Sequence, residues 1–124
     1  MTPILGACSP PGTITGCEVL IYDYSDPENP ILVSGIDTVN GGYEIERKGN
    51  FLYVSTSDNN SICSGSSSIR DGCELQVYDV TDPTNPVFHT GFDAGATLME
   101  FEVHGDYLYA TASANLGTCN LGVN

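Results

Sequence analysis

The feature that most constrains the fold is an internal repeat, in which residues 17–57 recur without a gap as residues 73–113. The two copies are 56 residues apart, and 16 of their 41 aligned positions are identical. A period of this length is typical of repeat architectures, in which one unit cannot bury its own apolar face and needs neighbours. Outside the two copies lie an N-terminal, a linking and a C-terminal segment: residues 1–16, 58–72 and 114–124.

Within each copy the sequence predicts β-strands and no helix. No long segment has a period of 3.6 residues, and Gly, Pro, Ser and Thr interrupt the chain at short intervals. Short runs rich in β-branched and aromatic residues predict four strands in each copy. These strands are expected at residues 18–24, 31–37, 43–48 and 51–57, and again at 74–80, 87–93, 98–104 and 107–112.

Turn residues separate the predicted strands at matching places in both copies. Residues 26–30 and 82–86 read Asp-Pro-x-Asn-Pro, and proline cannot donate to a strand ladder, while Asp and Asn bond their own backbone. Gly49 and Gly105 stand between the third and fourth strands, where they supply the positive φ of a tight hairpin. Each copy is therefore predicted to form a four-stranded antiparallel meander.

The strands are apolar or small on both faces, as in VLIY at residues 19–22 and FLYV at residues 51–54. Sheets covered on both sides have this pattern, and the radial stacking of a β-propeller covers them in this way. The predicted fold class is therefore all-β, with two four-stranded antiparallel propeller blades. Two blades cannot close a ring, so we expect other chains or further sequence to complete it. Three or four chains would form a ring of six or eight blades, and an assembly that does not close would be a filament.

The charge of the chain argues against two classes of partner. Three Lys and Arg residues against 16 Asp and Glu residues give a formal charge of −13. Such a field repels phosphate, so nucleic acid is not an expected partner. No segment approaches the roughly 20 apolar residues needed to cross a bilayer, so membrane insertion is not expected either.

Five cysteines indicate disulfides, because none has the CxxC spacing of a zinc or redox motif. Cys63 and Cys73 bracket a Ser- and Gly-rich loop that packing would stabilise little, so we expect them to pair. We expect Cys8 to pair with Cys17, the copy of Cys73. Cys119, the copy of Cys63, is then left without a partner in its own chain. Disulfides imply an oxidising compartment, so the expected location is secreted or at the cell surface.

Two motifs resemble the LVIVD repeat of bacterial and archaeal cell-surface proteins. The first is an apolar strand that ends in Asp and precedes the Asp-Pro-x-Asn-Pro turn, at residues 19–30 and 75–86. The second is a Gly-x-aromatic-x-Tyr strand at residues 49–54 and 105–110. The resemblance covers most of residues 17–113 and implies an extracellular β-propeller with no catalytic residues to carry over. This chain departs from the family pattern in having two units joined by a cysteine-bracketed loop.

The resemblance also implies that Glu44 lies near the start of a strand close to the propeller channel. Glu44 recurs as Glu100. A ring of carboxylates at this position would bind Ca²⁺ or another hard cation, because such ions are coordinated by six or more oxygen ligands. The alternative, which we favour, is an acidic strand face in a solvated channel, and no other cofactor is expected. Asn59 begins an Asn-x-Ser glycosylation pattern, which matters only if the source glycosylates secreted chains.

The sequence shows no catalytic constellation. It has no Gly-x-Ser-x-Gly elbow, and His89 and His104 occur only in the second copy. We therefore predict a non-enzymatic propeller module, a structural, self-assembling or protein-interaction unit at the cell surface or in a filament. Its expected partners are other copies of itself or further blades of a longer chain, with a surface protein or glycan as another candidate. The alternatives are a propeller module that binds Ca²⁺ or carbohydrate, and a fragment of a larger propeller enzyme.

Overall fold

The computed structural model describes residues 16–57, 63 and 72–113, which contain eight β-strands and no helix. The strands are β1 (Val19–Asp23), β2 (Ile31–Ile36), β3 (Gly42–Lys48), β4 (Phe51–Thr56), β5 (Leu75–Asp79), β6 (Val87–Phe92), β7 (Leu98–His104) and β8 (Tyr107–Ala112). No predicted strand end differs from the observed one by more than one residue. The all-β class is therefore confirmed.

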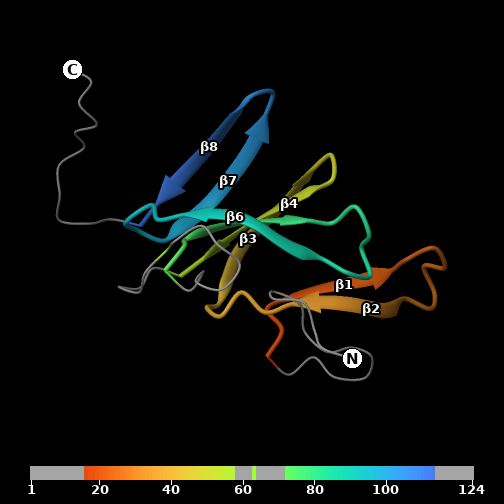
Figure 1. Ribbon diagram of the computed structural model, residues 1–124. Coiled ribbons are helices and arrows are strands. Elements are labelled where there is room, and N and C mark those ends of the chain that lie inside the picture. The colour runs from red at the N-terminus through yellow and green to blue at the C-terminus, as the bar shows by residue number, and fades with distance from the viewer. Residues whose placement is uncertain (1–15, 58–62, 64–71, 114–124) are drawn as a thin grey trace, which may run out of the picture.

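The strands form three antiparallel sheets, of which the central one has four strands in the order β3-β4-β5-β6. Strands β1 and β2 form a two-stranded sheet, and so do β7 and β8. The prediction that each copy folds into its own four-stranded meander is wrong, because the central sheet takes two strands from each copy (Figure 1). Within the described residues, each of the two outer sheets is a single hairpin from one copy.

The link from β2 to β3 carries the chain from one sheet to the next. Strand β3 pairs with β4 and not with β2, and Val39 within the link has a φ of 76°. The Thr38 N–H donates to Oε1 of Glu18 across 2.8 Å, which fixes the link to the start of β1. Strand β3 therefore begins a new layer.

The pairing of β4 with β5 joins the two copies into the central sheet. Leu52 lies opposite Tyr78 in the middle of this pair. Two backbone hydrogen bonds extend the ladder beyond the strand ends, from Thr56 N–H to Glu74 O and from Val80 N–H to Asn50 O.

The three sheets stack as layers, with one hairpin on each face of the central sheet (Figure 1). One hydrophobic cluster joins the β1–β2 hairpin to the central sheet, and its buried members are Val19, Ile36, Leu52, Val54, Tyr78 and Phe88. A second cluster joins the other face to the β7–β8 hairpin, through Leu75, Leu98, Phe101, Tyr53, Val103 and Leu108. Side chains alternate between the faces of a strand, so Leu52 and Tyr53 of β4 belong to different clusters. The central sheet is thus covered on both faces.

The predicted turns are confirmed. The Asp26 carboxylate accepts the N–H of Glu28 across 3.1 Å. In the second copy, the Asp82 carboxylate accepts the N–H of Thr84 across 3.0 Å. A φ of 60° occurs at both glycines of the hairpin turns, Gly49 and Gly105. Local sequence therefore determines where each strand ends.

Candidate functional site

The two glutamates singled out in the sequence, Glu44 and Glu100, face one seam between two layers. Glu44 is on β3 and Glu100 is on β7, and these two strands contact each other across the layers. Both line an open depression of about 450 Å³, together with Glu46, Glu102 and Tyr109. The structure thus brings four carboxylates to the same surface.

Part of this acidic seam has a structural role. Glu46 accepts a hydrogen bond from the Val103 N–H of β7, and Lys48 donates to the backbone oxygen of Gly105. Among the described residues, no group of three or more His, Cys, Asp or Glu side chains is arranged to hold a metal ion. The four glutamates are therefore an acidic surface and not a preformed coordination site.

The aspartates beside the Asp-Pro-x-Asn-Pro turns are used by the turns themselves. Asp79 accepts the Oγ1–H and the N–H of Thr81, across 2.6 and 2.9 Å, and these bonds lower the pKa of the Asp79 carboxyl. Thr84 bonds Asp82 in the same way and lowers its pKa. The first copy repeats the pattern at Asp23 and Asp26.

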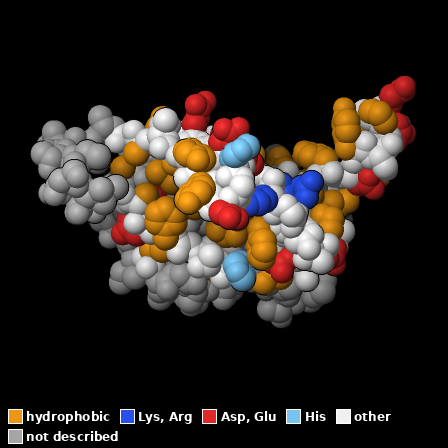
Figure 2. All heavy atoms as spheres, turned by 90° about the horizontal axis from the view of Figure 1, so that it is seen from above, with side chains coloured by type: hydrophobic (Ala, Val, Ile, Leu, Met, Phe, Trp, Pro, Cys, Tyr) orange, Lys and Arg blue, Asp and Glu red, His pale blue; other side chains and the backbone are white. Residues whose placement is uncertain are grey.

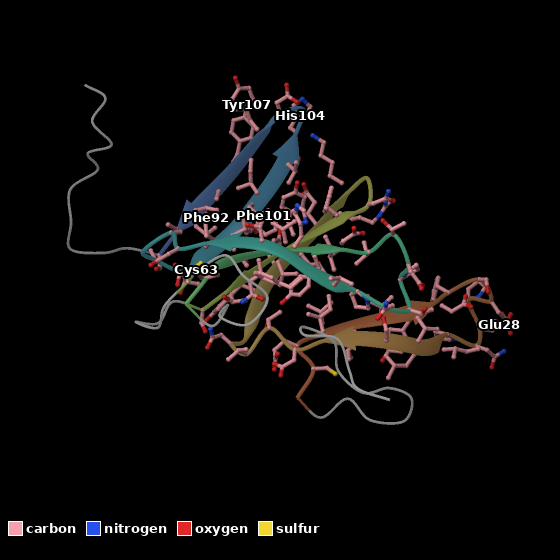
Figure 3. The ribbon with its side chains drawn as sticks, in the orientation of Figure 1. Glu28, Cys63, Phe92, Phe101, His104 and Tyr107 are labelled. Carbon is pink, nitrogen blue, oxygen red and sulfur yellow. A yellow bond between two sulfur atoms is a disulfide. The ribbon has the colours of Figure 1, made fainter. Side chains whose placement is uncertain are left out.

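The predicted disulfide between Cys63 and Cys73 is confirmed, with the two Cα atoms 4.7 Å apart. It joins the linking segment to residues just before β5, and Figure 3 shows Cys63 at one end of the central sheet. Cys17, the copy of Cys73, is also disulfide-bonded. The other candidates lie outside the described residues: Cys8, Cys119 and Asn59.

Each copy also places a glycine against the sulfur of its first cysteine. A Cβ atom built on Gly91 would lie 2.9 Å from Leu75 O and 3.0 Å from Cys73 Sγ. One built on Gly35 would lie 2.9 Å from Cys17 Sγ. No side chain fits at either place, so each hairpin can receive its cysteine only because β2 and β6 carry glycine there.

The sequence reasoning missed a buried carboxylate at Glu74. Its Oε1 accepts the N–H groups of Ala94 and Gly95, across 2.8 and 3.1 Å, and so fixes the link between β6 and β7. Its Oε2 is buried and has no hydrogen-bond partner among the described residues. Burial, with the Asp93 carboxyl beside it, raises the pKa of Glu74 from 4.5 to about 7. The signal that could have found it is the identity of Glu18 and Glu74 immediately before a strand.

The outward face of the β7–β8 hairpin exposes large aromatic side chains. Tyr107 and Tyr109 are 70% and 59% exposed, and their ring centroids are 6.4 Å apart. Figure 3 shows Tyr107 pointing away from the stack, and Figure 2, seen from the β7–β8 side, shows hydrophobic side chains at this surface. Tyr78 of the central sheet, in contrast, is completely buried, because the β1–β2 hairpin packs over it.

Comparisons with protein-family models, with curated proteins and with solved structures found no match. The resemblance to the LVIVD repeat therefore stays a prediction. The described part of the chain also holds no helix long and apolar enough to cross a membrane. Fold and surfaces together define an all-β repeat protein, in which a four-stranded sheet lies between two two-stranded sheets.

Proposed function

We propose that this chain is a non-enzymatic β-propeller repeat module that acts outside the cell as a structural, self-assembling or protein-interaction unit. The observation that best supports the proposal is the offset between the sequence repeat and the sheets. One complete four-stranded sheet is flanked by two-stranded sheets built from the same repeat. A two-stranded sheet alone is marginal in water, so both flanking sheets gain stability from further strands.

Exposed apolar surface supports the same proposal. Monomeric proteins rarely keep large apolar patches open, and such patches mark interaction surfaces. Here exposed aromatic side chains lie at both ends of the stack, with Tyr22 on β1 and Tyr107 and Tyr109 on β8. Chains that work by association would bury these residues.

The proposed location outside the cell rests on the disulfide between Cys63 and Cys73. Disulfides persist in oxidising compartments and are rare in the cytosol.

Size-exclusion chromatography with light scattering, on the full chain over a range of concentrations, tests the proposal. We expect a mass that is a multiple of 13.1 kDa or a concentration-dependent filament. A well-folded monomer at every concentration would contradict self-assembly and leave only a unit that interacts with other proteins.

A second candidate is a ligand-binding propeller module for Ca²⁺ or carbohydrate. The depression between β3 and β7 favours it, because four carboxylates and Tyr109 share that surface. Hard cations prefer carboxylate oxygens, and aromatic rings pack on sugars. Calorimetric titration with Ca²⁺ and with a glycan panel tests this candidate, since saturable heat would support it and its absence would favour the structural unit.

A further inference from the structure

We propose that strand β8 of one chain pairs with strand β1 of a second copy, in the antiparallel register that β4 and β5 have within the chain. The hairpins of the two copies would then form one four-stranded sheet in the order β7-β8-β1-β2, equivalent to the central sheet β3-β4-β5-β6. This inference rests on the proposed function and deepens it, because it names the partner and the residues that meet.

The template for the pairing is present inside the chain. Strand β8 is the repeat copy of β4, and β1 is the copy of β5, both displaced by 56 residues. In the central sheet, Leu52 lies opposite Tyr78. The corresponding pair between two chains is Leu108 opposite Tyr22, which are the same two residue types. The next pair, Tyr53 opposite Val77, becomes Tyr109 opposite Ile21.

The free backbone groups of β8 are directed as this register requires. Ser113 N–H donates to Thr97 O, so the odd-numbered residues of β8 bond towards β7 and the even-numbered ones point away from it. In β4, the copies of those even-numbered residues bond β5, as Thr56 does. Among the described residues β8 pairs only with β7, and β1 only with β2. Unpaired edges of this kind are templates for another strand.

Burial differs between repeat copies at two places that the second chain would cover. Tyr78 is 0% exposed, whereas its copy Tyr22 on β1 is 48% exposed. Ile36 is 0% exposed under the central sheet, and its copy Phe92 on β6 is 48% exposed. A shared four-stranded sheet would place further layers over both exposed residues. Figure 3 shows Phe92 on β6 at the edge of the stack.

The surface beside β1 has room for the incoming hairpin. Two hollows of about 320 and 540 Å³ lie along β1 and over β3, and both are lined by Ile45. Ile45 is 50% exposed, but its copy Phe101 is 5% exposed because it packs in the cluster that contains Tyr53. In the proposed pair of chains, Tyr109 of the incoming copy takes the place of Tyr53 and covers Ile45.

The contact between β3 and β7 would also have an equivalent between the two chains, in which the charges are complementary. Within the chain, Glu46 accepts the N–H of Val103. The copies of these residues are Glu102 and Arg47, so between two chains a carboxylate would meet a residue that carries a guanidinium. Arg47 lines the larger of the two hollows. One of the chain's three basic side chains therefore lies where the incoming copy brings an acidic residue.

Proline substitutions at the two edges test the inference on the full chain. Ala110→Pro removes an N–H that points away from β7, and Leu20→Pro removes the corresponding N–H of β1, so neither breaks a hairpin ladder. We expect each variant alone to be a folded 13.1 kDa monomer by light scattering and circular dichroism. An equimolar mixture should form a 1:1 dimer and stop there, because one intact β8 and one intact β1 remain. The control variants Ala110→Val and Leu20→Gln carry the residues of the other copy and should assemble as the wild type does.

The outcomes separate this inference from the proposed function. A wild-type monomer at every concentration overturns both the pairing and the self-assembly in the proposed function. Wild-type assembly that survives in either proline variant, or a mixture that stays monomeric although both variants are folded, overturns the pairing of β8 with β1 alone. If a proline variant does not fold, the register is tested with the double variant Tyr109→Cys and Ile21→Cys. These residues would face each other as a non-hydrogen-bonded pair, whose Cα spacing of about 4.5 Å suits a disulfide. Peptide mapping should then find that link between chains, and assembly without it would contradict the register.

Discussion

The Tyr78 hydroxyl donates a hydrogen bond to Oε1 of Gln76 across 2.5 Å, and both side chains are completely buried. Gln76 in turn donates from Nε2 to the backbone oxygen of Thr38, across 3.0 Å. This polar chain ties the central sheet to the link between β2 and β3. It therefore connects the segment in which the chain passes from one sheet to the next with the hydrophobic core between these two sheets.

Replacing Gln76 by leucine, the residue of the other copy, should lower the free energy of unfolding by about 2–3 kcal/mol. The reason is that the Tyr78 hydroxyl and the Thr38 carbonyl would lose a buried partner. Urea unfolding measures the change. Tyr78→Phe is the matched control and should cost about 1 kcal/mol, because it removes only one hydroxyl. Unchanged stability in Gln76→Leu would show that the polar chain does not hold the layers.

Val39 adopts a backbone conformation that its own repeat copy assigns to glycine. Its φ is 76°, and that of Gly95 is 75°. A β-branched residue in this region costs roughly 1–2 kcal/mol, and Val39 is exposed, so little packing offsets the strain. Val39→Gly should therefore raise the free energy of unfolding by about 1 kcal/mol, and with it the midpoint of thermal unfolding. The reverse change, Gly95→Val, should destabilise the protein by about 1–2 kcal/mol. If Val39→Gly and Gly95→Val were equally stable, the argument would be refuted.

The raised pKa of Glu74 makes stability depend on pH. Its folded-state pKa of about 7 lies above the ordinary value of 4.5, so the folded chain holds this proton more tightly than the unfolded chain. The stabilisation is complete below pH 4.5 and is lost as the pH rises to about 7. We expect a loss of about 1–3 kcal/mol, measured by urea unfolding between pH 4.5 and 8 at constant ionic strength.

Glu74→Gln isolates that contribution. The glutamine oxygen can still accept the N–H groups of Ala94 and Gly95, but the side chain has no proton to lose. The variant should show a flatter dependence of stability on pH, while the repulsion of the −13 net charge affects both proteins alike. Parallel curves for the variant and the wild type would assign the dependence elsewhere.

The disulfide between Cys63 and Cys73 should stabilise the chain mainly by restricting the unfolded state. The two cysteines are 10 residues apart in sequence, and a closed loop of this size is worth about 2–3 kcal/mol. Replacing both by serine should lower the urea midpoint accordingly and leave the strand content of the circular dichroism spectrum unchanged. A loss of all strand signal would mean that the central sheet depends on this link.

The candidate site was only partly predictable. The identity of Glu44 and Glu100 in the repeat indicated that both mark the same position, and the structure places them at one depression. That they meet depends on the stacking of β3 against β7, which no local pattern encodes. Glu74 was missed for a related reason, since its burial results from the path of the chain after β6.

Strand positions were set by local chemistry, so the amino-acid sequence alone determined them. Proline and aspartate end strands at residues 26–30 and 82–86, and glycine turns the hairpins at Gly49 and Gly105. Tertiary structure decided which strands share a sheet. A repeat defines how many strands make a unit but not which strand begins a sheet, because any four consecutive strands of this chain show the same pattern. Only the long-range bonds between β4 and β5, and the layers packed on both faces, make residues from the two copies one sheet.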